Sequence, residues 1–190
     1  NKTVGFIGGM DEVTVIEEFF IGYIQGVKYY DPETTVVYNY VGDWGNPDKG
    51  RTQALAQYND MNADVIFACA GGSGNGVHQA ASEVGKYVIG VDSDQSPLAP
   101  ETILTSALKR VDNACYDATK KTILGTLEGG VETYDLAAGG VDIAPTTDNL
   151  SKDVLEKIED AKKDIIAGDL VVPKNQEEFE EKYGDVYELD

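Results

Sequence analysis

A short strand followed by a cluster of glycines constrains the fold of this chain more than any other stretch. Residues 65–70 form an unbroken apolar run, which is typical of a strand buried on both faces of a parallel sheet. The run ends in Gly71-Gly72-Ser73-Gly74, and residues 77–84 then show a helical pattern. A glycine turn between a strand and a helix lies at the carboxyl edge of an open α/β sheet, where ligands of such folds bind. The glycines also allow backbone amides to face a ligand directly.

The glycine cluster fits neither of the common phosphate-binding motifs. A dinucleotide fingerprint needs Gly-x-Gly-x-x-Gly, and its last glycine would fall at position 77, which is Val77. A P-loop needs a Gly-Lys-Ser/Thr sequence, and no lysine follows these glycines. A tight turn without a ligand therefore stays an equal alternative to a binding turn.

The alternation of apolar strand and amphipathic helix continues along the first two thirds of the chain. Strands are predicted at residues 4–7, 35–41, 65–70, 87–91 and 103–108. Helices are predicted at residues 13–30, 49–61, 77–84 and 111–124. Asp11 and Asp48 are expected to cap the first two helices. Repeated βα units predict an α/β fold with a doubly wound parallel sheet and right-handed crossovers.

Polar residues and glycines follow each strand, so we expect them to meet at one edge of the sheet. This candidate ligand wall comprises Gly8-Gly9, Trp44, Gly71-Gly72, Asp92 and Lys109. Trp44 lies in a loop rich in Gly, Asn and Pro, where it is either a cap over the sheet edge or a flat face on which a ligand stacks. Asp92 and Asp94 fit three interpretations: an acid–base pair, a carboxylate that accepts two sugar hydroxyls, or turn capping alone.

The pattern changes after the fourth helix. Residues 132–142 alternate weakly and predict a short β ribbon. A helix is expected between Ser151, its cap, and Gly168, with a short extended segment at residues 171–173. The strongly acidic tail, residues 175–190, is expected to be a frayed and solvated terminus.

Charge and composition argue against several classes of function. The chain has 34 acidic and 15 basic residues, a net charge of −19, which disfavours nucleic acid and anionic membranes as partners. Cys69 and Cys115 are expected to be buried thiols and not a disulfide. The single histidine, His78, is expected to be exposed or capping, and the absence of a Cys-x-x-Cys motif disfavours zinc. We expect no metal and no cofactor, and no segment reaches the roughly 18 apolar residues of a membrane span.

Several motifs together resemble the basic membrane lipoprotein family of substrate-binding proteins, which includes purine nucleoside receptors of ABC transporters. The motifs are VGFIGGM at 4–10, WGNPDKG at 44–50, ADVIF at 63–67, AGGSGNG at 70–76, GVDSDQ at 90–95 and LTSALKR at 104–110. Each piece is unspecific, but the combination is specific and the resemblance covers nearly the whole chain. It implies a type I periplasmic-binding fold, with two α/β lobes and a nucleoside in the cleft between them.

The resemblance also implies roles for particular residues. In such proteins an aromatic residue from each lobe sandwiches the base, and Trp44 takes the position of this lobe's aromatic, where most relatives carry Phe. Gly71 or Gly72 corresponds to a backbone contact with the ligand. Asp92 and Lys109 correspond to the pair that holds the ribose hydroxyls, in agreement with their hydrogen-bonding chemistry.

Members of the family are considerably longer, and the resemblance implies that the first lobe and its lipid-anchoring cysteine are the missing part. Residues 1–110 would form the second lobe, and residues 111–190 a crossover helix, the β ribbon, the C-terminal helix and the acidic tail. The helix at 111–124 would normally pack on the first lobe, so we expect it to be misplaced, swapped between chains or packed on a partner, as in a homodimer. The whole protein would be extracytoplasmic, anchored to the cell membrane by lipid, with an ABC permease as its partner.

Three classes of function stay open. Binding of a purine nucleoside without catalysis is the leading hypothesis, and a sugar or another small polar ligand is the alternative, because Trp44 stacks on sugars as well as on bases. A hydrolase that uses Asp92 and Asp94 is disfavoured, because glycosidase carboxylates flank the bond from opposite sides and these two share one loop. A ligand-sensing regulatory domain is the third class, and no feature of the sequence discriminates it further.

Overall fold

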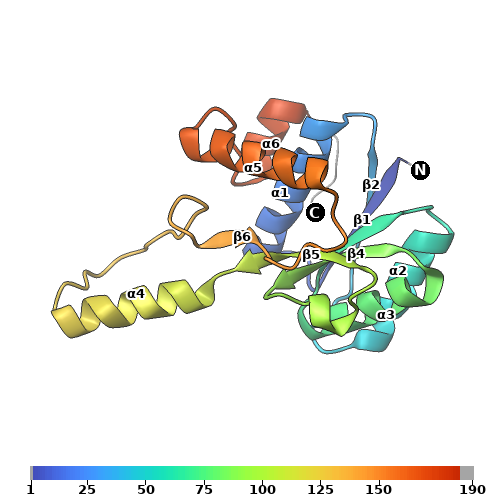
Figure 1. The fold of residues 1–190 in the computed structure, drawn as a ribbon, viewed down its shortest axis with the longest axis horizontal. Helices are drawn as coiled ribbons and strands as arrows, with labels where there is room; N and C mark the ends of the chain where they lie inside the picture. Colours follow the sequence, from blue (N-terminus) through green and yellow to red (C-terminus); the bar gives the residue numbers. More distant parts are fainter. Residues whose placement is uncertain (1, 185–190) are drawn as a thin grey trace.

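The computed structural model describes residues 2–184, which build a six-stranded sheet with helices on both faces (Figure 1). The strands are β1 (Thr3–Gly8), β2 (Thr35–Tyr40), β3 (Val65–Cys69), β4 (Tyr87–Asp92), β5 (Ile103–Lys109) and β6 (Val141–Ile143). They lie in the order β2-β1-β3-β4-β5-β6. The first five are parallel, and β6 pairs antiparallel with β5. The predicted doubly wound parallel sheet is confirmed.

Helices cover the two faces of the sheet and build a hydrophobic core on each. The helices are α1 (Thr14–Tyr30), α2 (Pro47–Asn59), α3 (Gly74–Val84), α4 (Val111–Leu124), α5 (Lys152–Ala167) and α6 (Gln176–Tyr183), with short 3-10 turns η1 (Gly71–Ser73) and η2 (Ser96–Leu98). Phe6 packs with residues of α1 and α6, and its neighbour Ile7 packs with α2 and α3. Successive residues of a strand point to opposite faces, so β1 is apolar at both positions. None of the helices within residues 2–184 is long and apolar enough to cross a membrane.

Two of the predicted helix caps are wrong. The cap position of α1 is Val13, whose side chain makes no capping hydrogen bond. Glu12 has a φ of 54°, so the chain turns between Asp11 and the helix and Asp11 stays outside the first turn. The cap of α2 is Asn46, and Asp48 lies one residue inside the helix after the proline that begins it.

The β ribbon predicted over residues 132–142 is also wrong. Only β6 is a strand in this stretch, and it pairs with the edge of β5 through the register Ala107 to Ile143. Backbone bonds from Arg110 to the carbonyl of Gly140 and from Ala144 to the carbonyl of Ser106, both 2.8 Å long, extend this pairing. The free edge of β5 is therefore a better hydrogen-bonding partner for this segment than the segment itself.

Helix α4 extends away from the sheet and has no buried residue along its length (Figure 1). Its contacts include a 2.8 Å hydrogen bond from the Tyr134 hydroxyl to Asp117, which ties it to the returning chain. Tyr116 and Ile123 are 71% and 79% exposed. The expectation that this helix does not pack on the sheet is confirmed, whereas its pairing with a first lobe or with a second copy stays a prediction.

The acidic tail was expected to fray, and this expectation is wrong for the part that forms α6. Asn175 caps the helix by accepting a 3.0 Å bond from the amide of Glu178. Phe179 is 1% exposed and belongs to the core on the α1 face. One buried aromatic ring therefore anchors a helix whose other side chains are mostly charged. Residues 185–190 lie outside the described part of the chain.

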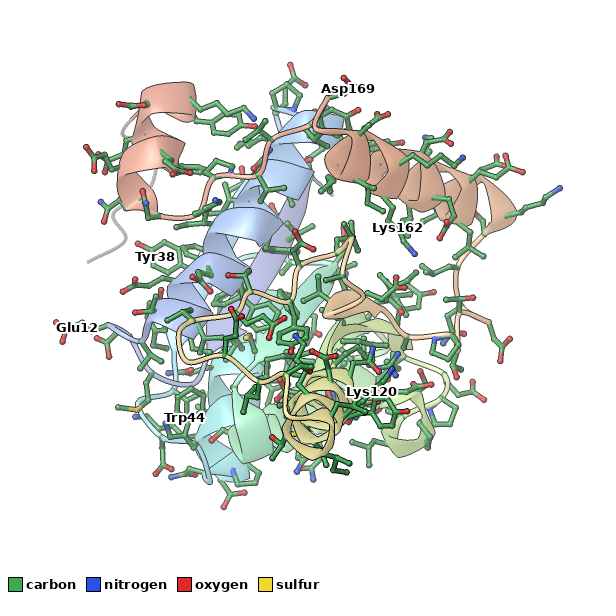
Figure 2. All side chains as sticks on the ribbon, turned by 90° about the vertical axis from the view of Figure 1, so that its left-hand side faces the viewer. Glu12, Tyr38, Trp44, Lys120, Lys162 and Asp169 are labelled. Carbon is green, nitrogen blue, oxygen red and sulfur yellow. The ribbon has the colours of Figure 1, made fainter. Side chains whose placement is uncertain are left out.

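Residues 171–173 form no strand, but they connect the C-terminal helices to α1. The carbonyl of Val171 accepts a 2.8 Å hydrogen bond from the Gln25 side chain of α1 and a 2.9 Å bond from Lys182 of α6. Figure 2 shows Lys162 of α5 directed back toward the rest of the molecule, and its Nζ lies 2.8 Å from Asp142 of β6. These bonds fix α5 and α6 on the face of the sheet that α1 covers.

Candidate functional site

Three turns at the carboxyl edge of the sheet are joined by backbone hydrogen bonds. The amide of Gly9, after β1, donates to the carbonyl of Cys69 at the end of β3 (3.0 Å). The amide of Gly42, after β2, donates to the carbonyl of Gly9 (2.8 Å), and Ser73 donates to the carbonyl of Trp44 (3.1 Å). The turns that follow β1, β2 and β3 therefore form one rigid surface, as the parallel sheet predicts.

Ser73 holds the tryptophan loop to this surface. Its side chain is fully buried, donates a 2.8 Å bond to the carbonyl of Asp43 and accepts a 2.9 Å bond from the amide of Asn46. The sequence did not identify this role, because a serine inside a glycine cluster gives no sign of which distant loop it contacts.

The Trp44 indole lies over two glycines. A Cβ atom added to Gly9 would lie 2.2 Å from the ring atom Cζ3, and one added to Gly71 would lie 3.4 Å from Cε3. The side chain remains 43% exposed, and Figure 2 shows it at the end of the molecule opposite Asp169. Trp44 thus caps the sheet edge, and it also presents exposed aromatic surface. The alternative that a ligand stacks on this surface stays a prediction.

Gly71 and Gly72 form the 3-10 turn that leads into α3. Gly71 has a φ of 54°, in the left-handed region that favours glycine. A Cβ atom on Gly72 would lie 3.0 Å from the carbonyl oxygen of Trp44. Helix α3 begins at Gly74, three residues before the predicted start. Glycine has a low helix propensity, so the sequence pattern did not predict that Gly74 and Gly76 belong to the helix.

Asp92 and Lys109 meet at the neighbouring strand ends. Their Oδ1 and Nζ atoms are 2.7 Å apart, and the side chains are 48% and 41% exposed. An ion pair this exposed contributes only about 0–1 kcal/mol to the free energy of unfolding, so its contribution to folding stability is small. The pKa of the Cys69 thiol on β3 is raised to about 12, mainly by burial and also by the charge of Asp92, while the charge of Lys109 acts in the opposite direction.

The Asp94 carboxylate stabilises the loop that follows β4. Its Oδ1 accepts a 3.0 Å bond from the amide of Ser96, and its Oδ2 accepts a 2.6 Å bond from the hydroxyl of Thr146. The bond from Thr146 lowers the pKa of the Asp94 carboxyl. The interpretation of Asp92 and Asp94 as an acid–base pair is therefore wrong for Asp94, which caps a turn. No cluster of three metal-binding side chains occurs within residues 2–184.

His78 and Cys115 differ from the predictions. His78 is 3% exposed, and its Nε2 lies 3.1 Å from Oε1 of Gln95 in the loop that follows β4. Burial lowers the pKa of this imidazole. Cys115 lies on the solvated helix α4 and is exposed, whereas Cys69 is buried as expected, and both are free thiols.

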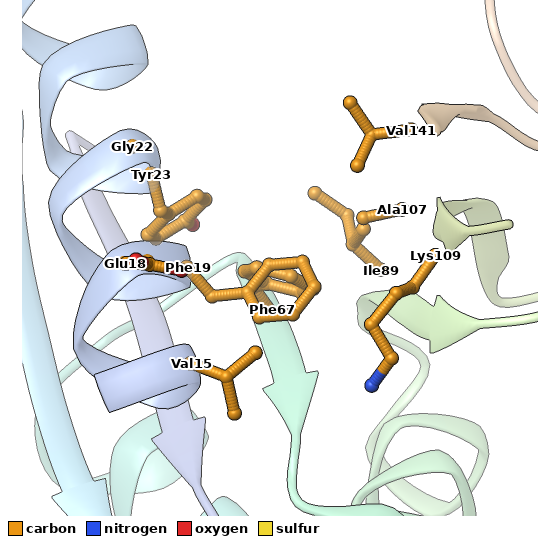
Figure 3. A pocket seen from close by; sticks show the side chains of 10 residues that line it. All are labelled: Val15, Glu18, Phe19, Gly22, Tyr23, Phe67, Ile89, Ala107, Lys109 and Val141. Carbon is orange, nitrogen blue, oxygen red and sulfur yellow. The ribbon is translucent and has the colours of Figure 1, made fainter. Parts of the chain in front are cut away.

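A hollow of about 490 Å³ lies beside the candidate wall but does not form it (Figure 3). Its walls come from α1 and from the sheet between β3 and β6, and it is lined by Val15, Glu18, Phe19, Gly22, Tyr23, Phe67, Ile89, Ala107, Lys109 and Val141. Lys109 is the one predicted site residue in this lining, and its ammonium group points away from Val141 (Figure 3). The candidate site is thus an open wall along the sheet edge and not an enclosed cavity.

Residues 1–176 match the family described as ABC transporter substrate-binding protein PnrA-like (Bmp). The CD4+ T-cell-stimulating antigen of Listeria monocytogenes is 38% identical over 188 residues, which cover 90% of this chain and 52% of the relative. The ABC transporter nucleoside-binding protein BmpA of Lactococcus lactis is 36% identical over 188 residues, with the same coverage of 90% and 52%. The chain therefore spans about half the length of these curated relatives.

The solved structures agree with the fold. The crystal structure of an ABC transporter system solute-binding protein from Aeropyrum pernix superposes with a TM-score of 0.82 at 25% identity, covering 96% of this chain and 61% of that one. The sheet and its flanking helices thus match one lobe of a type I periplasmic-binding protein. Because the family match covers most of its length, this chain belongs to the PnrA-like (Bmp) family of ABC transporter substrate-binding proteins.

Proposed function

We propose that this chain forms one wall of a cleft in which an ABC importer's binding protein holds a purine nucleoside. One observation carries the proposal. A half-exposed carboxylate–ammonium pair, Asp92 and Lys109, lies on the same sheet edge as the exposed indole of Trp44. These are the groups that a ribose and a flat base each require. The nucleoside-binding name of the Lactococcus lactis relative supports the same ligand class.

The ion pair suits two neighbouring hydroxyls of a ribose. An ionised carboxylate only accepts hydrogen bonds and has two oxygens, so Asp92 can accept from both hydroxyls at once. Lys109 forms an ion pair with Oδ1 of Asp92, and its ammonium group has three N–H donors, which can also serve a hydroxyl oxygen. The ion pair holds the carboxylate and the ammonium group 2.7 Å apart, where one sugar can reach both.

The indole suits the base. Stacking on an aromatic side chain is worth about 1–3 kcal/mol per base and depends little on which base is bound. Gly71 and Gly72 lie against Trp44, and their missing side chains let a ligand approach the backbone of the turn. In this proposal the opposite face of the base belongs to the other lobe, so the chain alone binds more weakly than the whole cleft.

The proposal assigns binding without chemistry. Asp94, the second carboxylate of the loop, accepts hydrogen bonds from Ser96 and Thr146 through its two oxygens, which gives it a structural role. The family is one of transport proteins. The whole protein would then work outside the cytoplasm, held at the membrane by a lipid, and would pass its ligand to an ABC permease.

Fluorescence of the single tryptophan tests the proposal on the chain itself. Adenosine, inosine, ribose and 2′,3′-dideoxyadenosine are titrated, and we expect saturable quenching of Trp44 by the two intact nucleosides. A hydrogen bond to a charged group contributes about 1.5–3 kcal/mol, so each hydroxyl that is lost should weaken binding roughly ten- to a hundredfold. Asp92→Asn should weaken adenosine and reduce its advantage over the dideoxy compound. Asp60→Asn, an exposed carboxylate at the end of α2, is the matched control.

Each other outcome contradicts a defined part of the proposal. Equal affinity for adenosine and 2′,3′-dideoxyadenosine would refute the role of Asp92. Ribose binding as tight as that of adenosine would refute the role of the base and favour a sugar ligand. Absence of binding by all four compounds at millimolar concentration would refute nucleoside binding by this wall.

A further inference from the structure

Asp92 occupies a backbone conformation that is rare for a residue with a side chain. Its φ is 68°, and the amide of Ser93 donates to the carbonyl of Val91 across it at 2.8 Å. A bond from residue i+2 to residue i around a central residue of positive φ defines the strained form of the γ-turn. Such strain persists only where the surroundings hold the backbone in place, and it gathers at functional sites.

The Gln95 side chain supplies much of that support. Its Oε1 accepts a 2.9 Å bond from the amide of Val91, the residue just before the strained position. The backbone amide of Gln95 donates a 3.0 Å bond to the hydroxyl of Ser106, which is fully buried on β5. Gln95 thus bridges the end of β4 to the neighbouring strand and closes the loop of residues 92–94 from the inside.

Gly90 makes room for this side chain. A Cβ atom on Gly90 would lie 2.6 Å from Oε1 of Gln95 and 2.5 Å from Oγ of Ser106. No left-handed φ is involved at Gly90, so the close approach of Gln95 and Ser106 is the structural feature that a side chain there would disturb.

His78 fixes the orientation of Gln95. Oε1 of Gln95 already accepts the Val91 amide, so the imidazole Nε2, 3.1 Å away, must be the donor. The other ring nitrogen, Nδ1, is buried and has no hydrogen-bond partner within residues 2–184. The ring therefore makes its one side-chain hydrogen bond to the oxygen that holds Val91.

We propose that Gln95, locked by His78 and Ser106, is the positioning residue that holds Asp92 in its strained turn with the carboxylate beside Lys109. The ligand part of this inference rests on the proposed function, whereas the turn itself does not. Gln95 acts through the backbone of Val91 and is not assigned a contact with the ligand.

Three variants of the 190-residue chain test the inference by NMR. Gln95→Met keeps the length of the side chain but removes the oxygen, so hydrogen exchange of the Val91 amide should become faster and the Asp92 backbone shifts should move. Adenosine affinity should fall about three- to tenfold, the worth of one hydrogen bond. Gln95→Glu keeps an acceptor oxygen at the same reach and should restore all three. Gln79→Met, an exposed residue next to His78 on α3, is the matched control.

The outcomes separate this inference from the proposed function. Wild-type exchange of the Val91 amide in Gln95→Met, or equal effects of Gln95→Met and Gln79→Met, would overturn the positioning role. If the wild-type chain binds no adenosine, the proposed function fails, and the Val91 exchange and Asp92 shifts still decide on the turn. Should Gln95→Met not fold, Gly90→Ala displaces the same oxygen, and unchanged Val91 exchange in that variant would overturn the inference.

Discussion

Gly9→Ala is expected to dislodge the indole of Trp44 from the sheet edge. The added methyl group would lie 2.2 Å from Cζ3 and 2.4 Å from Cε3 of the ring. Carbon atoms pack at about 3.5–4.0 Å, so the ring has to move by more than about 1 Å. Backbone strain plays no part, because the φ of Gly9 lies outside the left-handed region.

The side chain and not the loop should respond to this substitution. The carbonyl of Trp44 stays bound to the amide of Ser73, and the fully buried Ser73 hydroxyl keeps its bond to Asp43. The indole is already 43% exposed, so it can swing outward into solvent. We therefore expect a change of less than about 1 kcal/mol in the free energy of unfolding, well below the overpacking penalty of a closed core.

The single tryptophan makes the assay direct. Its emission, excited selectively over the tyrosines, should shift to the red in Gly9→Ala, and quenching by acrylamide should increase. Adenosine affinity should fall by up to the stacking contribution of about 1–3 kcal/mol, roughly ten- to a hundredfold if stacking is lost completely. Gly45→Ala is the matched control, since a Cβ there meets only Asp43 Oδ1 at 3.9 Å. Identical emission and affinity in the two variants would refute the packing of the Trp44 indole against Gly9.

Four further predictions concern stability. Phe179→Ala should lower the free energy of unfolding by about 3–5 kcal/mol in urea titrations, because the ring is 1% exposed, and an unchanged midpoint would mean that α6 does not dock. Burial lowers the pKa of His78 below its ordinary 6.5, so the unfolded chain binds the proton more tightly than the folded chain does. The free energy of unfolding should therefore fall as the pH drops from about 6.5 toward 5, and His78→Gln should reduce this pH dependence. Gly76→Ala should destabilise the chain by more than about 2 kcal/mol, because its Cβ would lie 1.8 Å from the Pro47 carbonyl of α2. Gly22→Ala on α1, where a Cβ meets nothing within 4 Å, should instead stabilise by about 0.5–1 kcal/mol in thermal unfolding.

The parallel sheet could be predicted because its signals are local. A strand buried on both faces is an unbroken apolar run, and β1 and β3 each end in glycines that mark the turn. The end of α4 could also be predicted from an adjacent residue, because Gly125 adopts the left-handed conformation that ends the helix. These features depend on residues only a few positions apart.

The errors fall where distant contacts decide the structure. The segment around β6 pairs with β5, which lies more than thirty residues earlier in the chain, so weak alternation within the segment predicted the wrong partner. Phe179 anchors α6 in a core built by α1, and nothing next to it in the sequence outweighs its acidic neighbours. Asp11 is a residue type that often caps helices, but the positive φ of Glu12 turns the chain between Asp11 and the helix.

The same distinction applies to the candidate site. Trp44, Asp92 and Lys109 were predicted to lie along one edge because the ends of parallel strands share it. The 2.7 Å ion pair confirms that Asp92 and Lys109 are close to each other. Ser73 and Gln95 were missed because their roles lie in bonds to loops and strands far along the chain.

The most direct test of the central claim is a map of amide and indole NMR shifts of this chain titrated with adenosine. We expect saturable shifts at the Trp44 indole, at Gly71 and Gly72, and at Asp92 and Lys109, and no shifts in α5 and α6. Shifts confined to the hollow between α1 and β5, or no shifts at millimolar adenosine, would contradict it.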